Sequence, residues 1–333
     1  MRLVLWRSRL QILFVILAAT LVVAQSVQSR GEAMLSRARA ASDIRHKDAP
    51  AFRLKVEFSF IGDDLEQKKG TFTEWWVSSD QWRRETESGG ARHLEIESGP
   101  YKIWLQDTGD ELPEQVKRLP SLVAITPPPS SKQQFDSIVP PVTNEPGIEC
   151  AVTIDPIRKE KSAFCFHTTS GVVIQKIEPI SLGRRVAAYR CDYGVFREFG
   201  QQTYPREMAC RIEGHQKIEA KVVDLSAQAP MDPGLFTPPA DAVEVDICAG
   251  KFKMADPKST LLNVNSLTEG SVAVEFIIDV KGNTQNVRVV HTAGKNLDDR
   301  AVKGVRSWRF SPATCDGRAI QVKSYVEVNF VLP

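Results

Sequence analysis

The last fifth of the chain carries a hydrophobic pattern whose period changes twice, and this pattern constrains the fold more than any other feature. Apolar side chains alternate with others over 272–278, which predicts a strand with one buried face. Gly282-Asn283 then favours a tight turn. Residues 297–310 then indicate a helix, with apolar residues at helical spacing up to 308 and Asn296 as its cap, and alternation returns over 322–332. The stretch therefore predicts a ββαβ unit.

Several short motifs stand at fixed offsets within this unit. G-x-V-x-V-x-F-x-I-D-x-x-G occupies 270–282, Leu297-Asp298 follows, and W-R-F-x-P-A at 308–313 precedes Asp316-Gly317. With this series the region 248–333 resembles the C-terminal domain of the TonB family. The resemblance implies a small domain whose last strand is a sheet edge. In that family the edge receives an extended segment, the TonB box, from an outer-membrane receptor.

Strand addition of this kind rests on unpaired backbone groups at a sheet edge, whatever the side chains. By position, the resemblance maps the edge to the last strand. The candidate partner-binding residues are Val322, Lys323, Tyr325, Val326, Glu327 and Asn329. The outward Lys323, Glu327 and Asn329 have a second interpretation, as charged and polar residues that blunt the edge against aggregation. Both interpretations stay open at this point.

The sequence departs from the TonB pattern in two ways. Family members carry a Tyr-Pro shortly before the first helix, and the segment 252–257 contains none. A transducer also needs a membrane anchor and a long Pro-rich spacer, whereas this chain has a globular region in the place of the spacer. Both departures favour an adaptor over an energy transducer that is coupled to an inner-membrane motor.

The region before this unit reads as one helix and a long series of strands. Residues 25–48 have a mixed apolar stripe at helical spacing, and 52–60 alternate strictly between apolar and polar residues. About ten short strands follow, separated by turn signals. This order predicts a large curved antiparallel sheet around a helix.

Two looser motifs add a resemblance for the N-terminal region. These are G-x-F-x-x-W-W-x-S-x-x-x-W-R at 70–83 and D-P-G-L-F-T-P-P at 232–239. The region resembles the LolA/LolB-like half-barrels of exported bacterial proteins. The predicted fold class is therefore α+β: a helix with a half-barrel sheet over 25–240, then a small TonB-like ββαβ domain over 241–333.

One long stretch interrupts the strand signals. Residues 119–142 contain Pro127-Pro128-Pro129 and Pro140-Pro141 and have no clear period. The pattern is typical of a loop or a short helical excursion. It is either a lid or a tolerated surface insertion.

Six cysteines indicate an oxidising compartment. Cys150 and Cys165 flank one hairpin-like stretch, and Cys191 and Cys210 flank another. Opposed residues of antiparallel strands lie within disulfide reach, which favours these two pairs and leaves Cys248 with Cys315. Six cysteines allow fifteen connectivities, so this pairing is a prediction from hairpin symmetry. The close Cys pairs of a zinc site are absent.

The N-terminus has the pattern of a secretory signal peptide over 1–24. A basic start precedes an apolar run from residue 12 to residue 23, which is short for a membrane span. We expect cleavage and a periplasmic protein. The alternative is a retained N-terminal anchor in the inner membrane. Omitting Arg2, Arg7 and Arg9 turns the net charge from +2 to −1, so no basic field argues for nucleic acid.

Three tryptophans, Trp75, Trp76 and Trp82, are candidate ligand-lining residues. Trp75 and Trp76 are adjacent, so in a strand they face opposite sides of the sheet. One of them belongs to a core. The other lies on the surface or lines the half-barrel concavity, where an acyl chain could bind.

No catalytic pattern is present. The five histidines are dispersed, and the sequence has no nucleophile elbow, P-loop or dinucleotide fingerprint. The prediction is a non-enzymatic periplasmic adaptor without metal or cofactor, which docks on an outer-membrane TonB-dependent receptor through its last strand. The alternatives are a carrier of lipid or lipoprotein that uses the N-terminal concavity, and an anchored transducer.

Overall fold

The structure is a computed structural model of the chain. It describes residues 27–332, apart from positions 63–64, 100–101, 111, 127–133, 142–145, 155–159, 183–184, 214, 229, 249, 261, 263 and 267. The signal-peptide prediction for 1–24 lies outside the described residues. Within the described ranges, no helix has both the length and the apolar character that crossing a bilayer requires.

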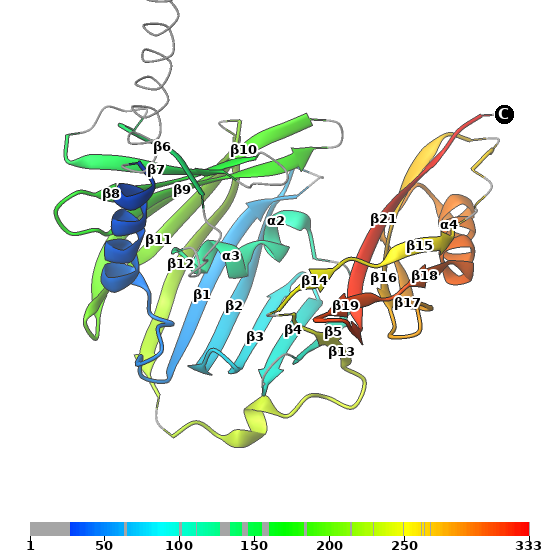
Figure 1. Cartoon of the computed structure of the whole chain (residues 1–333), viewed down its shortest axis with the longest axis horizontal. Helices are drawn as coiled ribbons and strands as arrows, with labels where there is room; N and C mark the ends of the chain where they lie inside the picture. Colours follow the sequence, from blue (N-terminus) through cyan, green and yellow to red (C-terminus); the bar gives the residue numbers. More distant parts are fainter. Residues whose placement is uncertain are drawn as a thin grey trace, which may run out of the picture. The chain divides into compact units, whose positions relative to one another are not determined.

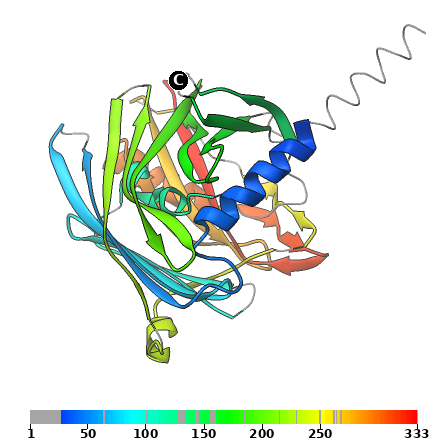
Figure 2. The ribbon, with the colours of Figure 1, turned by 90° about the vertical axis from the view of Figure 1, so that its left-hand side faces the viewer.

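A helix over 27–42 opens the described chain. Its buried side chains Met34, Leu35 and Ala38 recur at helical spacing, as the apolar stripe predicts. Arg30 pairs with Glu149, and the backbone N–H of Phe135 donates to Oε1 of Gln28, so the helix lies beside the strands that carry those residues. Figure 2 shows it as the blue helix running obliquely to the green strands.

Thirteen strands form one open antiparallel sheet (Figure 1). They are β1 (Phe52–Ile61), β2 (Gln67–Ser78), β3 (Gln81–Ser88), β4 (Ala91–Ser98), β5 (Lys102–Thr108), β6 (Gln134–Val139), β7 (Ile148–Ile154), β8 (Lys161–His167), β9 (Val173–Leu182), β10 (Arg185–Phe199), β11 (Gln202–Ile212), β12 (His215–Ala227) and β13 (Val243–Asp246). The order is β13-β5-β4-β3-β2-β1-β12-β11-β10-β9-β8-β7-β6. Two meanders, β1 to β5 and β6 to β12, are thus joined where β1 pairs with β12.

The alternation of β1 explains how the sheet is covered. Its even-numbered residues Phe52, Leu54, Val56, Phe58 and Phe60 are all buried, whereas the odd-numbered residues are half-buried or exposed. Side chains of a strand alternate between faces, so one face of β1 lies against other parts of the chain. We call this the inner face of the sheet and the opposite one the outer face.

The segment 112–126 covers part of the inner face and contains two short helices, α2 (Glu114–Lys117) and α3 (Leu119–Val123). Val116, Leu119 and Val123 are fully buried. The stretch that the sequence indicated as a loop or helical excursion therefore begins as a packed core element. Residues 134–139 form β6, and 127–133 lie outside the described residues.

All three disulfides join the pairs that the hairpin spacing favours. Cys150–Cys165 and Cys191–Cys210 each connect directly opposed residues of neighbouring strands. Cys248–Cys315 closes the longest loop, with a sequence separation of 67. Within the described residues, no cysteine is free.

After the 3-10 helix η1 (Pro233–Phe236) the chain forms the smaller sheets. β16 (Gly270–Ile278), β17 (Thr284–His291) and β21 (Val322–Phe330) make a three-stranded antiparallel sheet in the order β17-β16-β21. The helix α4 (Lys295–Ser307) packs against it (Figure 1). The shorter strands are β14 (Phe252–Lys253), β15 (Asp256–Ser259), β18 (Arg309–Ser311), β19 (Ala313–Cys315) and β20 (Arg318–Ile320).

The predicted ββαβ unit is present, with two corrections at the helix. Its N-cap is Gly294 with φ of 102°, and not Asn296. A positive φ suits glycine, and Asp298 bonds the preceding turn by accepting from the backbone N–H of Ala293. The helix ends at Ser307, and Arg309-Phe310 belong to β18.

The chain divides into two compact units. The first comprises Met1–Glu74, Thr86–Gly89 and Leu112–Ala229, and the second comprises Trp75–Glu85, Gly90–Glu111 and Pro230–Pro333. The predicted fold class is confirmed: an N-terminal helix, a large open antiparallel sheet and a small C-terminal sheet domain.

Candidate functional site

The strand β21 is an edge strand, because only β16 pairs with it in the sheet order β17-β16-β21. Backbone bonds at its two ends show which groups point away from β16. The N–H of Gln321 donates to Asp246 and its carbonyl accepts from the N–H of Asp246. The N–H of Val331 donates to the carbonyl of Val264, and the carbonyl of Val331 accepts from the N–H of Ser266. Residues 321 and 331 thus direct their backbone groups to the edge away from β16.

Between residues 321 and 331, every second residue likewise directs its backbone groups away from β16. The register of β16 against β21 shows no shift from Gly270↔Phe330 to Ile278↔Val322. In an antiparallel pair, alternate residues direct their N–H and C=O groups to opposite edges. Lys323, Glu327 and Asn329 therefore present backbone groups to the outer edge. Among the described residues, no strand pairs with this edge between its two bonded ends.

Side chains of β21 separate into two sets, as the alternation predicts. Val328 and Phe330 are buried in the core of the small sheet, with Val322 and Val326 packed against it. Tyr325 is 59% exposed, Lys323 pairs with Glu275, and Oε1 of Glu327 accepts from Ser271. The outward face is therefore polar and partly held by ion pairs. That composition is compatible with both partner binding and blunting of the edge.

The turn before β17 fixes the hairpin on which β21 packs. Oδ1 of Asp279 accepts from the N–H groups of Lys281 and Asn283, at 2.8 and 2.9 Å. Burial raises the pKa of Asp279, but the hydrogen bonds from Asn283 outweigh it and lower the pKa. Gly282 has φ of 84°, and a Cβ there would lie 1.9 Å from the carbonyl oxygen of Phe310. Only glycine fits this turn.

A chain of alternating charges within the second unit leads to β21. His93 lies 2.6 Å from Asp107 and 3.3 Å from Glu95, measured from its two ring nitrogens. Arg288 lies 2.8 Å from Asp107 and 2.6 Å from Glu275, and Lys323 lies 2.8 Å from Glu275. Arg84 closes the other end, 3.9 Å from Glu95. This charge chain connects β3, β4, β5, β17, β16 and β21.

Histidine 93 is the titrating centre of the charge chain. Burial lowers its pKa, but the hydrogen bonds to Asp107 and Glu95 outweigh that effect and raise the pKa to about 9. Burial also raises the pKa of the two carboxyls, but the hydrogen bonds with His93 outweigh it, so the pKa of Asp107 and of Glu95 is lowered. His93 is therefore a cation between two carboxylates at neutral pH.

A hollow of about 280 Å³ lies over part of the charge chain, and Lys323, Glu275 and Arg288 are among its lining residues. Of the acidic groups that line it, Asp107 and Glu275 have cationic partners. Asp241 accepts from Nε2 of Gln106. Among the described residues, no cluster of three or more His, Cys, Asp or Glu side chains has an arrangement that could hold a metal ion. The arrangement suits ion pairing between strands.

Side chains on the inner face of the first unit donate hydrogen bonds to the carbonyl oxygens of α3. The Tyr193 hydroxyl donates to Leu122 O at 3.1 Å, and the Tyr204 hydroxyl donates to Val123 O at 2.7 Å. Lys176 Nζ donates to Ser121 O at 3.2 Å. Carbonyls at the end of a helix lack intrahelical partners, so these side chains satisfy them. Burial raises the pKa of Tyr204 to about 12 and also raises that of Tyr193, so both hydroxyls remain donors.

A buried ion pair lies beside α3. Glu74 is fully buried and accepts from Nε of Arg45 at 3.1 Å, and Nη1 of Arg45 also donates to Val123 O. Burial lowers the pKa of Arg45, but the charge of Glu74 outweighs it and raises the pKa. Arg45 thus joins the sheet to the segment 112–126. This segment of the chain thus occupies part of the inner face.

The three tryptophans differ in their burial and in their contacts. Trp76 and Trp82 are buried, and Trp75 is half-buried with the guanidinium of Arg83 5.9 Å from its ring centre. Nε1 of Trp82 donates to Glu97 at 2.6 Å. None of them lines the 280 Å³ hollow or a second, open hollow of about 610 Å³ on β1, β10, β11 and β12.

Neither the buried pair of Arg45 and Glu74 nor the charge chain around His93 was predicted from the sequence. Glu74 stands between Phe72 and Trp76 at inward positions of one strand, and such a polar residue in an apolar series indicates a buried partner. No comparable signal existed for the charge chain, because its members lie on six strands far apart in sequence. Each of them looks like an ordinary surface charge when its strand is read alone.

Comparison with protein families gives one match. Residues 266–332 match the family described as Gram-negative bacterial TonB protein C-terminal. This confirms the resemblance of the C-terminal region and supports a protein of the cell-envelope adaptor type. The match covers the small sheet with α4 and its edge strand β21, and it leaves the large sheet outside. No curated protein matches the chain.

Several solved structures align with this chain at low identity. A LolA superfamily protein from Nitrosomonas europaea is 11% identical, with a TM-score of 0.43 over 62% of this chain and 97% of that one. A DUF1329 family protein from Desulfovibrio piger is 8% identical, with a TM-score of 0.42 over 63% and 96%. MucB in complex with MucA(peri) is 12% identical, with a TM-score of 0.25 over 90% and 93%.

Proposed function

We propose that the protein is a non-enzymatic adaptor of the periplasm, which binds an extended segment of an outer-membrane transport protein along β21. One observation carries this proposal. β21 is a sheet edge whose outward backbone groups have no strand partner among the described residues, although both its ends are bonded. An added strand would satisfy these groups without a conformational change in the sheet.

The edge limits what can bind. The bonds at Gln321 and Val331 close it at both ends, so the ligand is a short extended segment rather than a whole sheet. Side chains of the added strand would lie beside Lys323, Tyr325 and Glu327, which present both charges and an aromatic ring. A polar, extended segment fits this edge better than an apolar one.

The test separates the backbone from the side chain at one position. Glu327→Pro removes an N–H that points to the open edge, whereas Glu327→Ala keeps it. We expect Glu327→Pro to abolish binding of a synthetic peptide taken from the N-terminal extension of a TonB-dependent receptor, and Glu327→Ala to stay within about threefold of the unaltered chain. Isothermal titration with the peptide gives both values.

Equal binding by Glu327→Pro and Glu327→Ala would show that β21 does not receive a strand. Loss of binding in both would show that the Glu327 side chain, and not the edge, recognises the peptide. Circular dichroism of each variant confirms that the small sheet is intact. If no receptor peptide binds the unaltered chain, the proposed partner is wrong.

The carrier of lipid or lipoprotein is the second candidate, and one observation favours it. The segment that covers part of the inner face is short, and side chains of the sheet donate hydrogen bonds to its carbonyls. If it moved, the buried Phe52, Phe72 and Tyr204 would line an apolar surface. Tyr193→Phe with Tyr204→Phe removes two of those bonds and should raise lipid uptake, measured by native mass spectrometry. No uptake by either protein rejects the carrier.

A further inference from the structure

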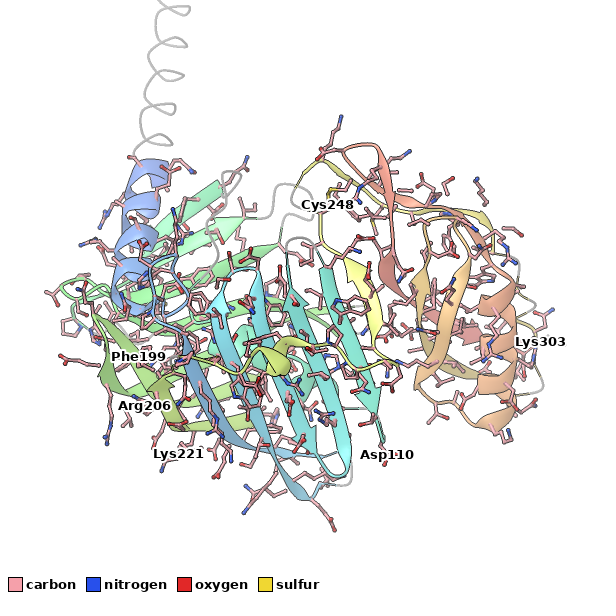
Figure 3. The ribbon with its side chains drawn as sticks, turned by 90° about the horizontal axis from the view of Figure 1, so that it is seen from below. Asp110, Phe199, Arg206, Lys221, Cys248 and Lys303 are labelled. Atoms are coloured by element: carbon pink, nitrogen blue, oxygen red, sulfur yellow. A yellow bond between two sulfur atoms is a disulfide. The ribbon has the colours of Figure 1, made fainter. Side chains whose placement is uncertain are left out.

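A segment of the second unit exposes large apolar side chains between lysines. Phe252 and Met254 are 50% and 73% exposed, although β14 is paired with β19. They are two positions apart in an extended segment, which places them on one side of it. Lys251 and Lys253 alternate with them, so their long side chains start on the other side of the segment, and both are exposed. In Figure 3 the segment begins just after the labelled Cys248.

Cations from neighbouring strands extend this surface. Phe252 lies opposite Cys315, and Cys315 lies opposite Arg318, so Phe252 and Arg318 stand in one row across the small sheet. Arg318 and Lys258 are exposed. We call Lys251, Phe252, Lys253, Met254, Lys258 and Arg318 the cationic strip.

Two acidic residues, Asp256 and Asp316, lie within or next to the segments that carry the cationic strip. Asp256 lies 3.8 Å from Lys253, a long pair between two exposed side chains. Asp316 is used locally, since its Oδ1 accepts from the backbone N–H of Lys251. Among the described residues, Lys251, Lys258 and Arg318 make no ion pair within 4 Å, so Lys253 is the one cation of the strip with an acidic partner. The strip keeps a positive surplus beside apolar groups that can leave water.

We propose that the cationic strip docks the protein on a bilayer surface that contains anionic phospholipid. Apolar side chains gain by entering the interface, and lysine and arginine are attracted by anionic headgroups. Long cationic side chains keep their charge at headgroup level while their methylene groups lie deeper. Charge complementarity selects this occupant, because a neutral apolar partner would leave Lys251, Lys258 and Arg318 without counter-charges.

This surface is separate from the edge of β21 in its chemistry. Strand addition uses backbone groups and depends on their geometry, whereas membrane docking uses apolar insertion and charge. Docking would hold the adaptor close to a membrane, where an extended receptor segment emerges. The two activities can fail independently, so the membrane proposal does not rest on the peptide-binding proposal.

The experiment is co-sedimentation of the full chain with vesicles of phosphatidylglycerol and phosphatidylcholine, and with vesicles of phosphatidylcholine alone. We expect binding to the anionic vesicles to exceed binding to the neutral ones. Lys251→Gln with Lys253→Gln and Arg318→Gln should weaken the anionic binding about tenfold or more. Phe252→Ser with Met254→Ser should weaken it about tenfold.

Matched controls change charge and apolar surface elsewhere. Lys281→Gln with Lys295→Gln and Lys303→Gln removes the same charge from exposed positions; Lys303 is labelled in Figure 3. Leu65→Ser with Val280→Ser removes exposed apolar groups. Both controls should bind like the unaltered chain. If a control loses as much as its strip variant, general charge or hydrophobicity explains the binding and the strip is wrong.

A local probe settles which part enters the membrane. Met254→Trp places an indole at the most exposed apolar position of the strip. Its fluorescence should be quenched by brominated phosphatidylglycerol in excess of the quenching that the chain shows without this substitution. No additional quenching, or equal binding of all proteins to neutral vesicles, overturns the proposal.

Discussion

The inner face of the large sheet and the edge of β21 differ in whether their backbone polar groups are hydrogen-bonded within the chain. On the inner face, the carbonyls of Ser121, Leu122 and Val123 each accept from a side chain of the sheet or of the loop before it. At β21, backbone groups of alternate residues point to an edge that no described strand covers. One region satisfies its polar groups internally, and the other leaves them for a partner.

The two regions therefore differ in what a ligand must displace in order to bind. Buried polar groups must be paired, so those of the inner face bond within the chain and hold the segment 112–126 in place. Edge groups can remain in water at low cost and still bond an incoming strand. Binding at β21 therefore needs no rearrangement, whereas binding at the inner face must first displace a packed segment. Substitutions in each region should therefore change the free energy of unfolding by different amounts.

The largest expected effect comes from the buried pair of the inner face. Glu74→Ala leaves Arg45 buried without its carboxylate, which should lower the free energy of unfolding by about 3–5 kcal/mol. Urea denaturation followed by circular dichroism measures this change. The matched control is Glu149→Ala, which breaks the exposed pair with Arg30 and should cost less than about 1 kcal/mol. Similar costs for both variants would show that the inner face is not tightly paired.

The next effect compares the disulfides of the two units. Replacing Cys248 and Cys315 by serine opens a loop with a separation of 67, against 19 for Cys191 and Cys210. Chain entropy predicts losses of about 4 and about 3 kcal/mol, respectively. Calorimetry should show the first change in the transition of the second unit and the second change in that of the first. The reverse assignment would contradict the two-unit division.

A smaller effect depends on pH and concerns the charge chain. The folded pKa of His93 is about 9, above its ordinary value of 6.5. Its stabilising contribution is therefore complete below pH 6.5 and is lost as the pH rises through 9. The free energy of unfolding of the second unit should fall by on the order of 2 kcal/mol over this window, and His93→Gln should remove the dependence.

The control for this prediction is His167→Gln, since His167 is exposed and lies outside the charge chain. It should leave the pH dependence unchanged. A flat profile in the unaltered chain would mean that His93 does not gain its proton through Asp107 and Glu95. On the acidic side, the pKa of Asp107 is lowered, so its contribution is complete above its ordinary pKa and is lost as the pH falls from there through the lowered pKa.

The features that were predictable from the sequence are those in which local pattern and final environment agree. β1 alternates strictly and buries one face. β16 buries the predicted Val272, Val274, Phe276 and Ile278, and Ala273 and Ile277 of its other face are buried as well. The hairpin cysteines pair across neighbouring strands, which short separations already indicate. Gly282 in the turn of the small sheet has positive φ, as its position in the motif suggests. In each case the physical cause acts within about twenty residues.

The unpredicted features depend on long-range contacts. The segment 112–126 contains Pro113 and Pro120, which break helical periodicity, so its buried Leu119 and Val123 looked like part of a loop. Strands of two to four residues, such as β14 and β18, are too short for an alternation to be recognised. The cap at Gly294 was missed because the bond from Asp298 to the preceding turn depends on its geometry.

The smallest expected effect lies where the charge chain meets the edge of β21. Lys323 pairs with Glu275 at 2.8 Å, with 34% of its side chain exposed, so Lys323→Gln should cost only about 0.5 kcal/mol of unfolding free energy. A double-mutant cycle with Glu275→Gln should give a coupling of similar size that shrinks at high salt. Because the backbone of Lys323 is unchanged, peptide binding at the edge should persist. A coupling above about 2 kcal/mol would mean that β21 is held as tightly as the inner face, and the contrast between the two regions would no longer hold.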